Sequence, residues 1–466
     1  MKVRRLNGVL IALAVLAVLV IGRLIPQQGE TILLWLLSAG VGIAVLLRPV
    51  LGLYMMVGLI PLTNEIVLVE GVSTSRIVGM VTIGAWLVGK LARREPLSAL
   101  TSGSMTWPII SYTSLVVLSG LWAESSSLWT AAMPTVVRLV LMFFMVSDIV
   151  TSWSRLRNLI LILLCSGLLA MTIGAYVFFF QGTLRASWGY GTANGFSSLV
   201  LVLLPFAFYF FVHGRKLERS IGLLSVAVGV VALGASVTRT SLVIGLFLLL
   251  YQFWEWRQVG QRRLIVVVAI VLVVASLFVP WDAIADRMAG LVAGDEITTI
   301  EGRGFRWRVA VLQILDHPVL GVGYANYGAA YYTYAGKLDP RVLFLGGSAR
   351  KVVHSLYFGI LAELGVAGLV LFAWLIGTSL KVLRSAISRE RELDRQDTRW
   401  LLVALRISFL CYLLYSVALS TEDSKLLWLL FALVEVAGRL APAPLADVAL
   451  TPEHSSESPY LAGSAT

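Results

Sequence analysis

The chain has 466 residues, of which 58% are hydrophobic and only 14% are charged, and its mean hydropathy is +0.86. A soluble domain carries about a quarter charged residues, so this composition excludes a water-soluble globule built around a single core. The formal net charge of +11 could suggest a nucleic-acid partner. The distribution of the basic residues argues against nucleic acid, because it follows membrane topology.

Apolar runs of a length that crosses the hydrocarbon core of a bilayer recur along the whole chain. Helices satisfy their own backbone hydrogen bonds in lipid, so the pattern predicts an all-α, polytopic transmembrane helical bundle with about 12–14 spans. The expected spans cover residues 7–22, 31–47, 50–68, 76–90, 105–121, 130–148, 158–180, 195–212, 220–236, 240–254, 264–280, 354–380, 400–420 and 425–440.

The distribution of Lys and Arg predicts the orientation of these spans. With a cytoplasmic N-terminus, the inside segments carry 22 Lys and Arg and the outside segments carry 13, of which eight lie in the long loop 281–353. Short outside segments therefore hold only five, and short loops are the ones that the positive-inside rule counts. We expect a multi-pass protein of the cell inner (cytoplasmic) membrane, with the long loop on the outer, periplasmic face. The first span lacks a small-residue cleavage site, which is typical of an anchor.

Four regions follow from this topology. Residues 1–280 hold about eleven N-terminal transmembrane helices, and residues 281–353 form the extracytoplasmic (periplasmic) loop. Residues 354–440 hold the C-terminal transmembrane helices, where the charged stretch 381–399 predicts a solvated, cytoplasmic helix extension. Residues 441–466 are rich in Pro, Ser and Ala and are expected to form a disordered cytoplasmic tail.

The long outer loop contains an amphipathic pattern. Residues 305–316 place Trp307, Val311, Ile314 and Leu315 along one helical stripe, and we expect this helix to end before Pro318. An aromatic run with Tyr324 and Tyr327 follows. Three arginines gather at the start of the predicted helix, where they could equally hold anionic membrane lipid. They are Arg303, Arg306 and Arg308.

Three further polar residues stand at the outer ends of predicted spans: Arg185, Arg239 and His354. Guanidinium groups chelate phosphate oxygens and keep their charge, so two of them would suit a lipid diphosphate. Histidine can take a proton from an attacking hydroxyl. The alternative for each arginine is snorkelling to the headgroups, and for the histidine it is an interfacial hydrogen bond. Spacing alone leaves these alternatives open.

Metal ligands are not part of the expected site. The outer segments contain no acidic DxD cluster and no His/Cys group with metal spacing, and Cys165 and Cys411 both fall inside apolar runs. We therefore expect no metal and no cofactor, with arginine neutralising any leaving diphosphate. Two charges deep in predicted spans, Glu363 and Arg138, are expected to pair with each other, because an unpaired intramembrane charge is costly.

Several of these positions carry a family resemblance. The run from Arg303 through His317-Pro318-Val319-Leu320-Gly321-Val322-Gly323 to Asn326 resembles the "hPllGvG…nf" signature of the O-antigen ligase/polymerase superfamily. The stretch from His354 to Leu369 resembles that family's "HN.yL…l.E.G..GL" helix start, with Ser355 in place of Asn. Residues 237–241 resemble its "SRt" loop, with Thr238 in place of Ser, and Asn194 resembles its "N..a" position. The resemblance covers about residues 180–375, and the earlier spans match in hydropathy alone.

The resemblance implies an enzyme that moves a glycan from undecaprenyl diphosphate to an acceptor hydroxyl outside the cytoplasmic membrane. It implies that Arg185 and Arg239 bind the diphosphate, that His354 activates the acceptor, and that transfer is metal-independent and inverts the anomeric carbon. The acceptor would be lipid A-core or another glycan. Trp307, Tyr324 and Tyr327 would offer aromatic faces to sugar rings, with Arg303, Arg306, Arg308 and Asn194 as further substrate contacts.

The expected function is thus an O-antigen-ligase-type glycosyltransferase, with a polymerase of the same family nearly as well supported. Protein oligosaccharyltransferases form a third subgroup of the family. A solute (bicarbonate) transporter is the rival from another class, although Glu363, Arg138 and Arg406 do not line up as the polar path that transport needs. A scaffold subunit without activity is a further rival, for which His354 would be dispensable.

Overall fold

The computed structural model describes residues 48–62, 67–69, 72–92, 102–189, 192–256, 302–344, 351–420 and 423–441, with the single positions 45, 94, 281, 282 and 285 besides. The expected spans at 7–22 and 264–280, nearly all of the span at 31–47, and the tail from residue 442 onward lie outside the described residues.

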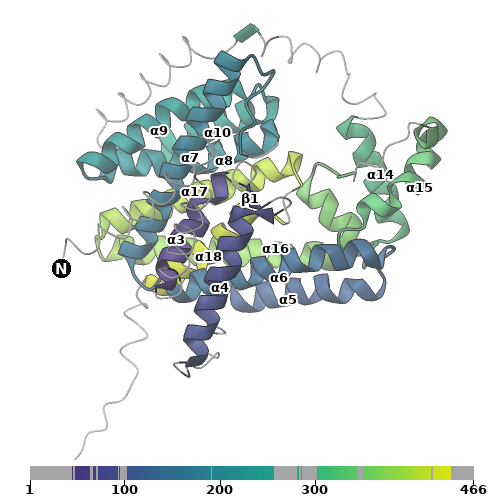
Figure 1. Cartoon of the computed structure of the whole chain (residues 1–466), viewed down its shortest axis with the longest axis horizontal. Coiled ribbons are helices and arrows are strands. Elements are labelled where there is room, and N and C mark those ends of the chain that lie inside the picture. The colour runs from purple at the N-terminus through teal and green to yellow at the C-terminus, as the bar shows by residue number, and fades with distance from the viewer. Residues whose placement is uncertain are drawn as a thin grey trace, which may run out of the picture.

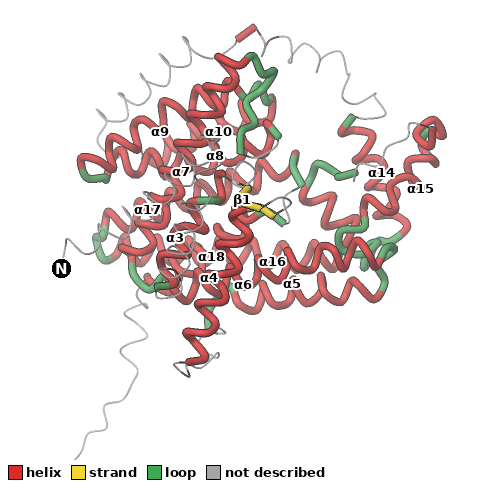
Figure 2. Tube along the Cα trace, viewed as in Figure 1, coloured by secondary structure: helices red, strands yellow, loops and turns green. Residues whose placement is uncertain are grey.

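Helices make up almost all of the described chain (Figures 1 and 2). In chain order they are α3 (Pro49–Gly58), α4 (Thr74–Ala92), α5 (Thr106–Leu118), α6 (Ser126–Ile149), α7 (Trp153–Gln181), α8 (Ala193–His213), α9 (Lys216–Ala235), α10 (Arg239–Trp256), α14 (Arg303–Asp316), α15 (Tyr327–Leu338), α16 (Leu356–Glu392), α17 (Gln396–Tyr415) and α18 (Lys425–Leu440). Short 3₁₀ segments are η1 (Ile60–Leu62), η3 (Ser119–Leu121), η4 (Pro340–Phe344) and η5 (Ser416–Ala418).

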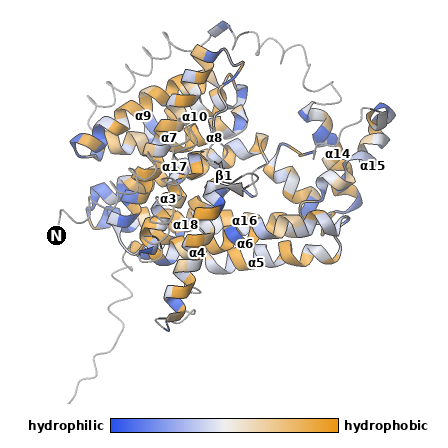
Figure 3. Ribbon diagram, viewed as in Figure 1, coloured by the Kyte–Doolittle hydropathy of each residue, from blue (hydrophilic) through white to orange (hydrophobic). Residues whose placement is uncertain are grey.

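The predicted fold class, an all-α polytopic membrane bundle, is confirmed. Every expected span that falls on described residues contains a helix, and seven of the described helices are long and apolar enough to cross a membrane. Figure 3 shows apolar residues along the lengths of the long helices and polar residues gathered at their ends. Large apolar side chains such as Val88, Leu121 and Phe180 are exposed, as expected for surfaces that face lipid.

The expected span at 50–68 is wrong in detail. Its helix, α3, ends at Gly58, and η1 follows. Pro61 has no backbone N–H and cannot continue an α-helix, so the chain changes direction here. The strands β1 (Val67–Val69) and β2 (Val72–Ser73) then form a short antiparallel hairpin that leads into α4.

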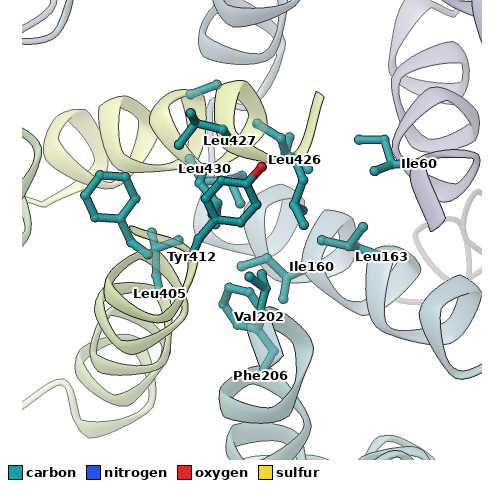
Figure 4. Packing of buried hydrophobic residues seen from close by; sticks show 14 of the residues in the cluster. Ile60, Ile160, Leu163, Val202, Phe206, Leu405, Tyr412, Leu426, Leu427 and Leu430 are labelled. Atoms are coloured by element: carbon teal, nitrogen blue, oxygen red, sulfur yellow. The ribbon is translucent and has the colours of Figure 1, made fainter. Parts of the chain in front are cut away.

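The bundle core is centred on α8, whose most apolar stretch is completely buried. Figure 4 shows how side chains from α7, α8, α17 and α18 meet around Tyr412. In lipid, helices associate through close packing rather than through the hydrophobic effect, and small residues permit that approach. Gly222 of α9 illustrates this, because a Cβ there would overlap the α8 backbone at Ala207 and Phe211.

An ion network ties four helices together at the predicted inner end. Arg157 of α7 pairs with Glu218 of α9 at 2.8 Å and with Asp397 of α17 at 3.0 Å. Tyr209 of α8 donates its hydroxyl hydrogen to Asp397 at 2.8 Å. Because Arg157 and Glu218 are partly buried and would be costly if left unpaired, the network fixes how these helices meet.

The predicted solvated extension after the twelfth span is confirmed as far as residue 392. Helix α16 continues from the apolar region through residues 381–392 without leaving helical geometry there. It packs against α5, α14, α17 and α18, and Figure 1 shows it running beneath the α14–α15 unit. The helix that carries the expected catalytic end is therefore also the support for the outer loop.

Candidate functional site

Helix α16 is broken near its outer end, and the break receives the outer loop. Gly365 adopts φ 64° and ψ −164°, which lies outside helical geometry. The segment 317–323 lies along the break and replaces the lost helical hydrogen bonds. Val322 and Gly323 donate their N–H groups to the carbonyls of Ala362 and Glu363 at 3.0 and 2.9 Å, and Val366 donates to Pro318 at 2.9 Å. Backbone groups that would otherwise be unpaired in a buried position are thus satisfied.

Two glycines make this interlock possible. Gly321 and Gly365 both have positive φ, and each faces the backbone of the opposing segment. A Cβ on Gly365 would overlap the carbonyl of Val319, and a Cβ on Gly321 would overlap the backbone of Glu363. Only glycine combines these dihedral angles with so close an approach.

Glu363 fastens the loop at the same point. Its carboxylate accepts hydrogen bonds from the backbone N–H groups of Ala325 at 2.7 Å and Tyr327 at 3.0 Å, at the N-terminus of α15. A carboxylate suits this position, because helix N-termini carry unpaired N–H groups and partial positive charge. The expected Glu363–Arg138 pair is therefore wrong. The sequence alone could not show that backbone N–H groups satisfy Glu363.

The turn between α5 and α6 holds the loop from its other side. Trp122 donates its indole N–H to the carbonyl of Leu320 at 3.1 Å, and the N–H of Glu124 bonds the carbonyl of Val322 at 3.1 Å. The N–H of Ser125 bonds the side-chain oxygen of Asn326 at 2.6 Å. The outer loop is therefore packed between this turn and the break in α16.

This docking positions α14 beside His354. Tyr327 donates its hydroxyl hydrogen to the carbonyl of Arg306 at 3.0 Å, and Trp307 packs against Phe358 of α16 with ring centroids 5.6 Å apart. His354 stands two residues before α16 and is half-buried. Burial, followed by the positive charges of Arg306 and Arg303, lowers the pKa of His354 from 6.5 to about 4. The imidazole is thus held neutral near pH 7, the form that accepts a proton.

Arg185 and Arg239 are brought together by the turn between α9 and α10. Arg185, in the α7–α8 connection, donates to the carbonyl of Ser236 at 3.1 Å and to the Thr238 hydroxyl oxygen at 3.3 Å. Arg239 follows Thr238 directly, as the first residue of α10. Arg185 thus contacts the turn from which Arg239 begins α10.

The first turn of α8 packs against the same turn. The hydroxyl groups of Ser197 and Thr238 lie 3.0 Å apart. Asn194 is three residues before Ser197, and residues at this spacing share one side of a helix. The side-chain oxygen of Asn194 is buried and has no hydrogen-bond partner in the described structure. Asn194 thus lies one turn before Ser197, at the end of α8 that contacts the turn between α9 and α10.

Tyr415, at the end of α17, connects the two halves of the site. Its hydroxyl lies within electrostatic reach of both Arg185 and Arg303. Helix α17 also meets the start of α16, where Tyr357 donates its hydroxyl hydrogen to the carbonyl of Leu413 at 2.9 Å. Arg185 and Arg239 therefore lie at the same end of the bundle as His354 and its neighbours Arg303 and Arg306. Sequence reasoning missed Tyr415, because a tyrosine at the end of an apolar helix belongs to no recognisable chemical pattern on its own.

Unusual backbone geometry also marks this end of the bundle. Val237, Ala325 and His354 have φ values of 45°, 62° and 57°. Such values are uncommon for residues with a Cβ and most unfavourable for a β-branched one. Strain of this kind persists where surrounding contacts impose it, and it concentrates at functional sites. Here it occurs beside Arg239, beside Glu363 and at the histidine itself.

Some expected side chains lie differently from the prediction. The buried residues of α14 are Phe305, Val309, Ala310 and Gln313, whereas Val311 and Leu315 are exposed. The face of α14 that packs on α15 and α16 is therefore not the predicted apolar stripe, and Val311 and Leu315 of that stripe are left exposed. The end of this helix before Pro318 is confirmed.

The aromatic residues of the loop are structural in this conformation. Tyr324 and Tyr327 are 6% and 2% exposed, so their rings are not presented to a sugar. Trp307 is half-buried against Phe358. Arg308 is exposed and stacks over Phe305, 5.5 Å from the ring centroid, with no described contact to His354. Within the described ranges no group of three or more His, Cys, Asp or Glu gathers in a metal-binding arrangement.

The role of Glu363 is directly testable. Glu363→Ala leaves two buried N–H groups without an acceptor, at about 1–3 kcal/mol each. We expect the loop 302–344 to be cleaved faster by protease in detergent, and amides 325 and 327 to exchange hydrogen faster. Glu392→Ala, at the exposed inner end of the same helix, is the matched control. Unchanged cleavage and exchange in Glu363→Ala would contradict this role.

Comparison with known proteins gives two matches. The profile of a family described as O-antigen ligase matches residues 224–373. A protein of Rhizobium meliloti (strain 1021), named exopolysaccharide production protein ExoQ, is 25% identical over 158 residues. That match covers 34% of this chain and 36% of the relative, so the similarity spans about a third of each protein. The family match runs from α9 through the α14–α15 unit into α16, and so contains Arg239, His354 and Glu363.

Proposed function

This chain is a member of the O-antigen ligase-like superfamily, and from that premise we propose that it transfers a glycan from undecaprenyl diphosphate to an acceptor hydroxyl in polysaccharide biosynthesis. The reaction would take place on the outer, periplasmic face of the cytoplasmic membrane, without a metal and with inversion at the anomeric carbon. The observation that supports the proposal is that two pairs of arginines lie at one end of the bundle together with a histidine. They are Arg185 and Arg239, Arg303 and Arg306, and His354.

Each group has a distinct task in this reaction. The acceptor oxygen attacks the anomeric carbon while the bond from that carbon to the diphosphate oxygen breaks, and the leaving diphosphate keeps the electron pair. Arg185 and Arg239 neutralise the charge that develops on the diphosphate. Neutral His354 takes the proton of the attacking hydroxyl. The nearby charges of Arg303 and Arg306 favour this neutral form.

Polymerisation is the second candidate, in which the acceptor is another lipid-linked repeat. The name of the Rhizobium relative, an exopolysaccharide production protein, favours it. Ligation to lipid A-core and polymerisation use the same donor chemistry and differ in the acceptor. A transporter draws no support from either comparison. An inactive scaffold would not require a neutral histidine beside arginines.

Reconstitution tests the proposal most directly. The purified protein in proteoliposomes should convert an undecaprenyl-diphosphate glycan and an acceptor into a longer glycan and free undecaprenyl diphosphate. Lipid A-core and a second lipid-linked repeat, supplied separately, distinguish ligation from polymerisation. We expect turnover to persist in EDTA. Turnover that EDTA abolishes and a divalent ion restores would refute the metal-independent mechanism, and solute uptake without glycan transfer would refute the function.

The pH dependence of the reaction follows from His354. The pKa of His354 is lowered to about 4, so the proton-accepting form persists down to that pH and is lost below it. We expect kcat/KM to fall on the acid side near pH 4. Arg306→Gln removes a nearby positive charge and should move this fall to higher pH. The prediction would be contradicted if kcat/KM of the wild type fell near the ordinary histidine pKa of 6.5, and if Arg306→Gln did not change the pH of that fall.

A further inference from the structure

A second group of cations lies apart from the site described above. It consists of Arg76 near the start of α4, Arg138 within α6 and Lys425 at the start of α18. Lys425 donates to the Ser75 hydroxyl oxygen at 2.8 Å, which places it beside Arg76. The charges of Arg76 and Arg138 both act on Lys425, and Arg76 also acts on Arg138. We refer to these three residues as the second cationic cluster.

The second cationic cluster and the candidate site lie on either side of one connection. Tyr415, within reach of Arg185 and Arg303, ends α17, and Lys425 begins α18 after the connection 416–424. The charges that act on Lys425 come from Arg76 and Arg138 instead. The two groups therefore share one end of the bundle but are electrostatically distinct.

Several other cations within the bundle have a carboxylate partner. Lys90 pairs with Asp148 at 2.7 Å, Arg157 with Glu218 at 2.8 Å, and Arg406 with Glu255 at 2.7 Å. Across the described ranges, the second cationic cluster forms no such pair.

Arg138 and Lys425 are partly buried and Arg76 is exposed, and three like charges that act on one another are unfavourable without an anion. Thr74, beside Ser75, is fully buried, and its hydroxyl has no hydrogen-bond partner in the described structure. The second cationic cluster therefore lacks an anionic partner among the described side chains, although Lys425 and Arg138 each donate to a hydroxyl.

The sequence provides an independent observation. The short outside segments carry five Lys and Arg, and positive-inside topology makes cations rare there. Two of the five, Arg185 and Arg239, fall in the candidate site. Two more, Arg76 and Lys425, fall in the second cationic cluster. Cations kept on the disfavoured face are thus gathered in two places.

We propose that Arg76, Arg138 and Lys425 form a second phosphate site, which holds the phosphate of the lipid acceptor while Arg185 and Arg239 hold the donor diphosphate. This inference rests on the proposed function. Both classes of acceptor considered above are phosphate-bearing lipids, so the site serves ligation and polymerisation alike. Guanidinium and ammonium groups at the level of the headgroups are suited to such a ligand.

Native mass spectrometry with two probes, undecaprenyl diphosphate and phosphatidylglycerol, tests the site. Wild-type protein should bind two molecules of undecaprenyl diphosphate. Lys425→Gln and the exposed Arg76→Gln should weaken one of the two by about tenfold or more, the loss expected for one charge-assisted contact. Arg239→Gln should weaken the other. Arg384→Gln, an equal charge change on the exposed inner part of α16, should bind like wild type.

The outcomes separate this inference from the proposed function. Binding of a single undecaprenyl diphosphate that Arg239→Gln weakens and Lys425→Gln does not would overturn the second site alone. Binding of none would overturn the proposed function as well. If phosphatidylglycerol displaces the second molecule at equal concentration, the cluster is a site for bulk membrane lipid and the inference fails. In the transfer reaction, Arg76→Gln should raise the KM for the acceptor and leave the KM for the donor unchanged.

Discussion

Replacing His354 with alanine is expected to lower glycan transfer by about 10²–10⁴-fold, the usual contribution of a general base. The imidazole is half-buried, is held neutral beside Arg303 and Arg306, and stands at the start of the helix on which the outer loop is docked. In a strain that lacks the native gene, cells carrying His354→Ala should accumulate lipid-linked glycan and lose the mature polymer. The rate measured in proteoliposomes checks the magnitude.

A second substitution separates chemistry from folding. His354 has φ 57°, a conformation that asparagine tolerates better than alanine does. His354→Asn should therefore keep the melting temperature of the wild type and still lose turnover. His454→Ala removes an imidazole from the predicted tail and serves as the control. Wild-type turnover in His354→Asn would remove the histidine from the mechanism and contradict the prediction.

Gly365→Ala should be the most damaging single substitution for folding. The new Cβ would overlap the carbonyl of Val319, and φ 64° with ψ −164° is a region that essentially only glycine occupies. Strain of about 1–3 kcal/mol adds to the loss of the hydrogen bonds between 317–323 and α16. We expect poor recovery of monodisperse protein in detergent and a markedly lower melting temperature.

Helix α16 provides its own control for this experiment. Gly377 lies farther along the same helix, and a Cβ there meets no atom within 4 Å. Gly377→Ala should therefore be neutral or slightly stabilising, because alanine favours the helix by about 1 kcal/mol over glycine. Equal melting temperatures for Gly365→Ala and Gly377→Ala would show that the break in α16 is not needed for stability.

Much of the fold could be predicted from hydropathy alone. Apolar length and the Lys/Arg pattern located the helices, because lipid leaves few other solutions for a long apolar segment. The hydrogen-bond partners of Glu363 could not be predicted, since they are backbone N–H groups that a helix break brings close to it.

The candidate site was predictable in its chemistry and less so in its geometry. Arg185, Arg239 and His354 could be selected because polar groups at the ends of apolar helices are rare. The aromatic residues Tyr324 and Tyr327 were expected at the surface, yet the structure buries Tyr327 against α14 and Tyr324 in the core of the bundle. Aromatic side chains suit both a sugar platform and a packed core, and sequence alone does not distinguish these uses.

The interlock between residues 317–323 and α16 sets a rule for recombining this protein with its relatives. Each partner supplies backbone hydrogen bonds that the other needs, so the outer unit 302–344 and the helix start 354–367 behave as a single inherited module. A chimera whose crossover falls at 345–350 would join mismatched halves of that module and should misfold. Crossovers placed before residue 302 and after residue 377 would transplant specificity and its scaffold together.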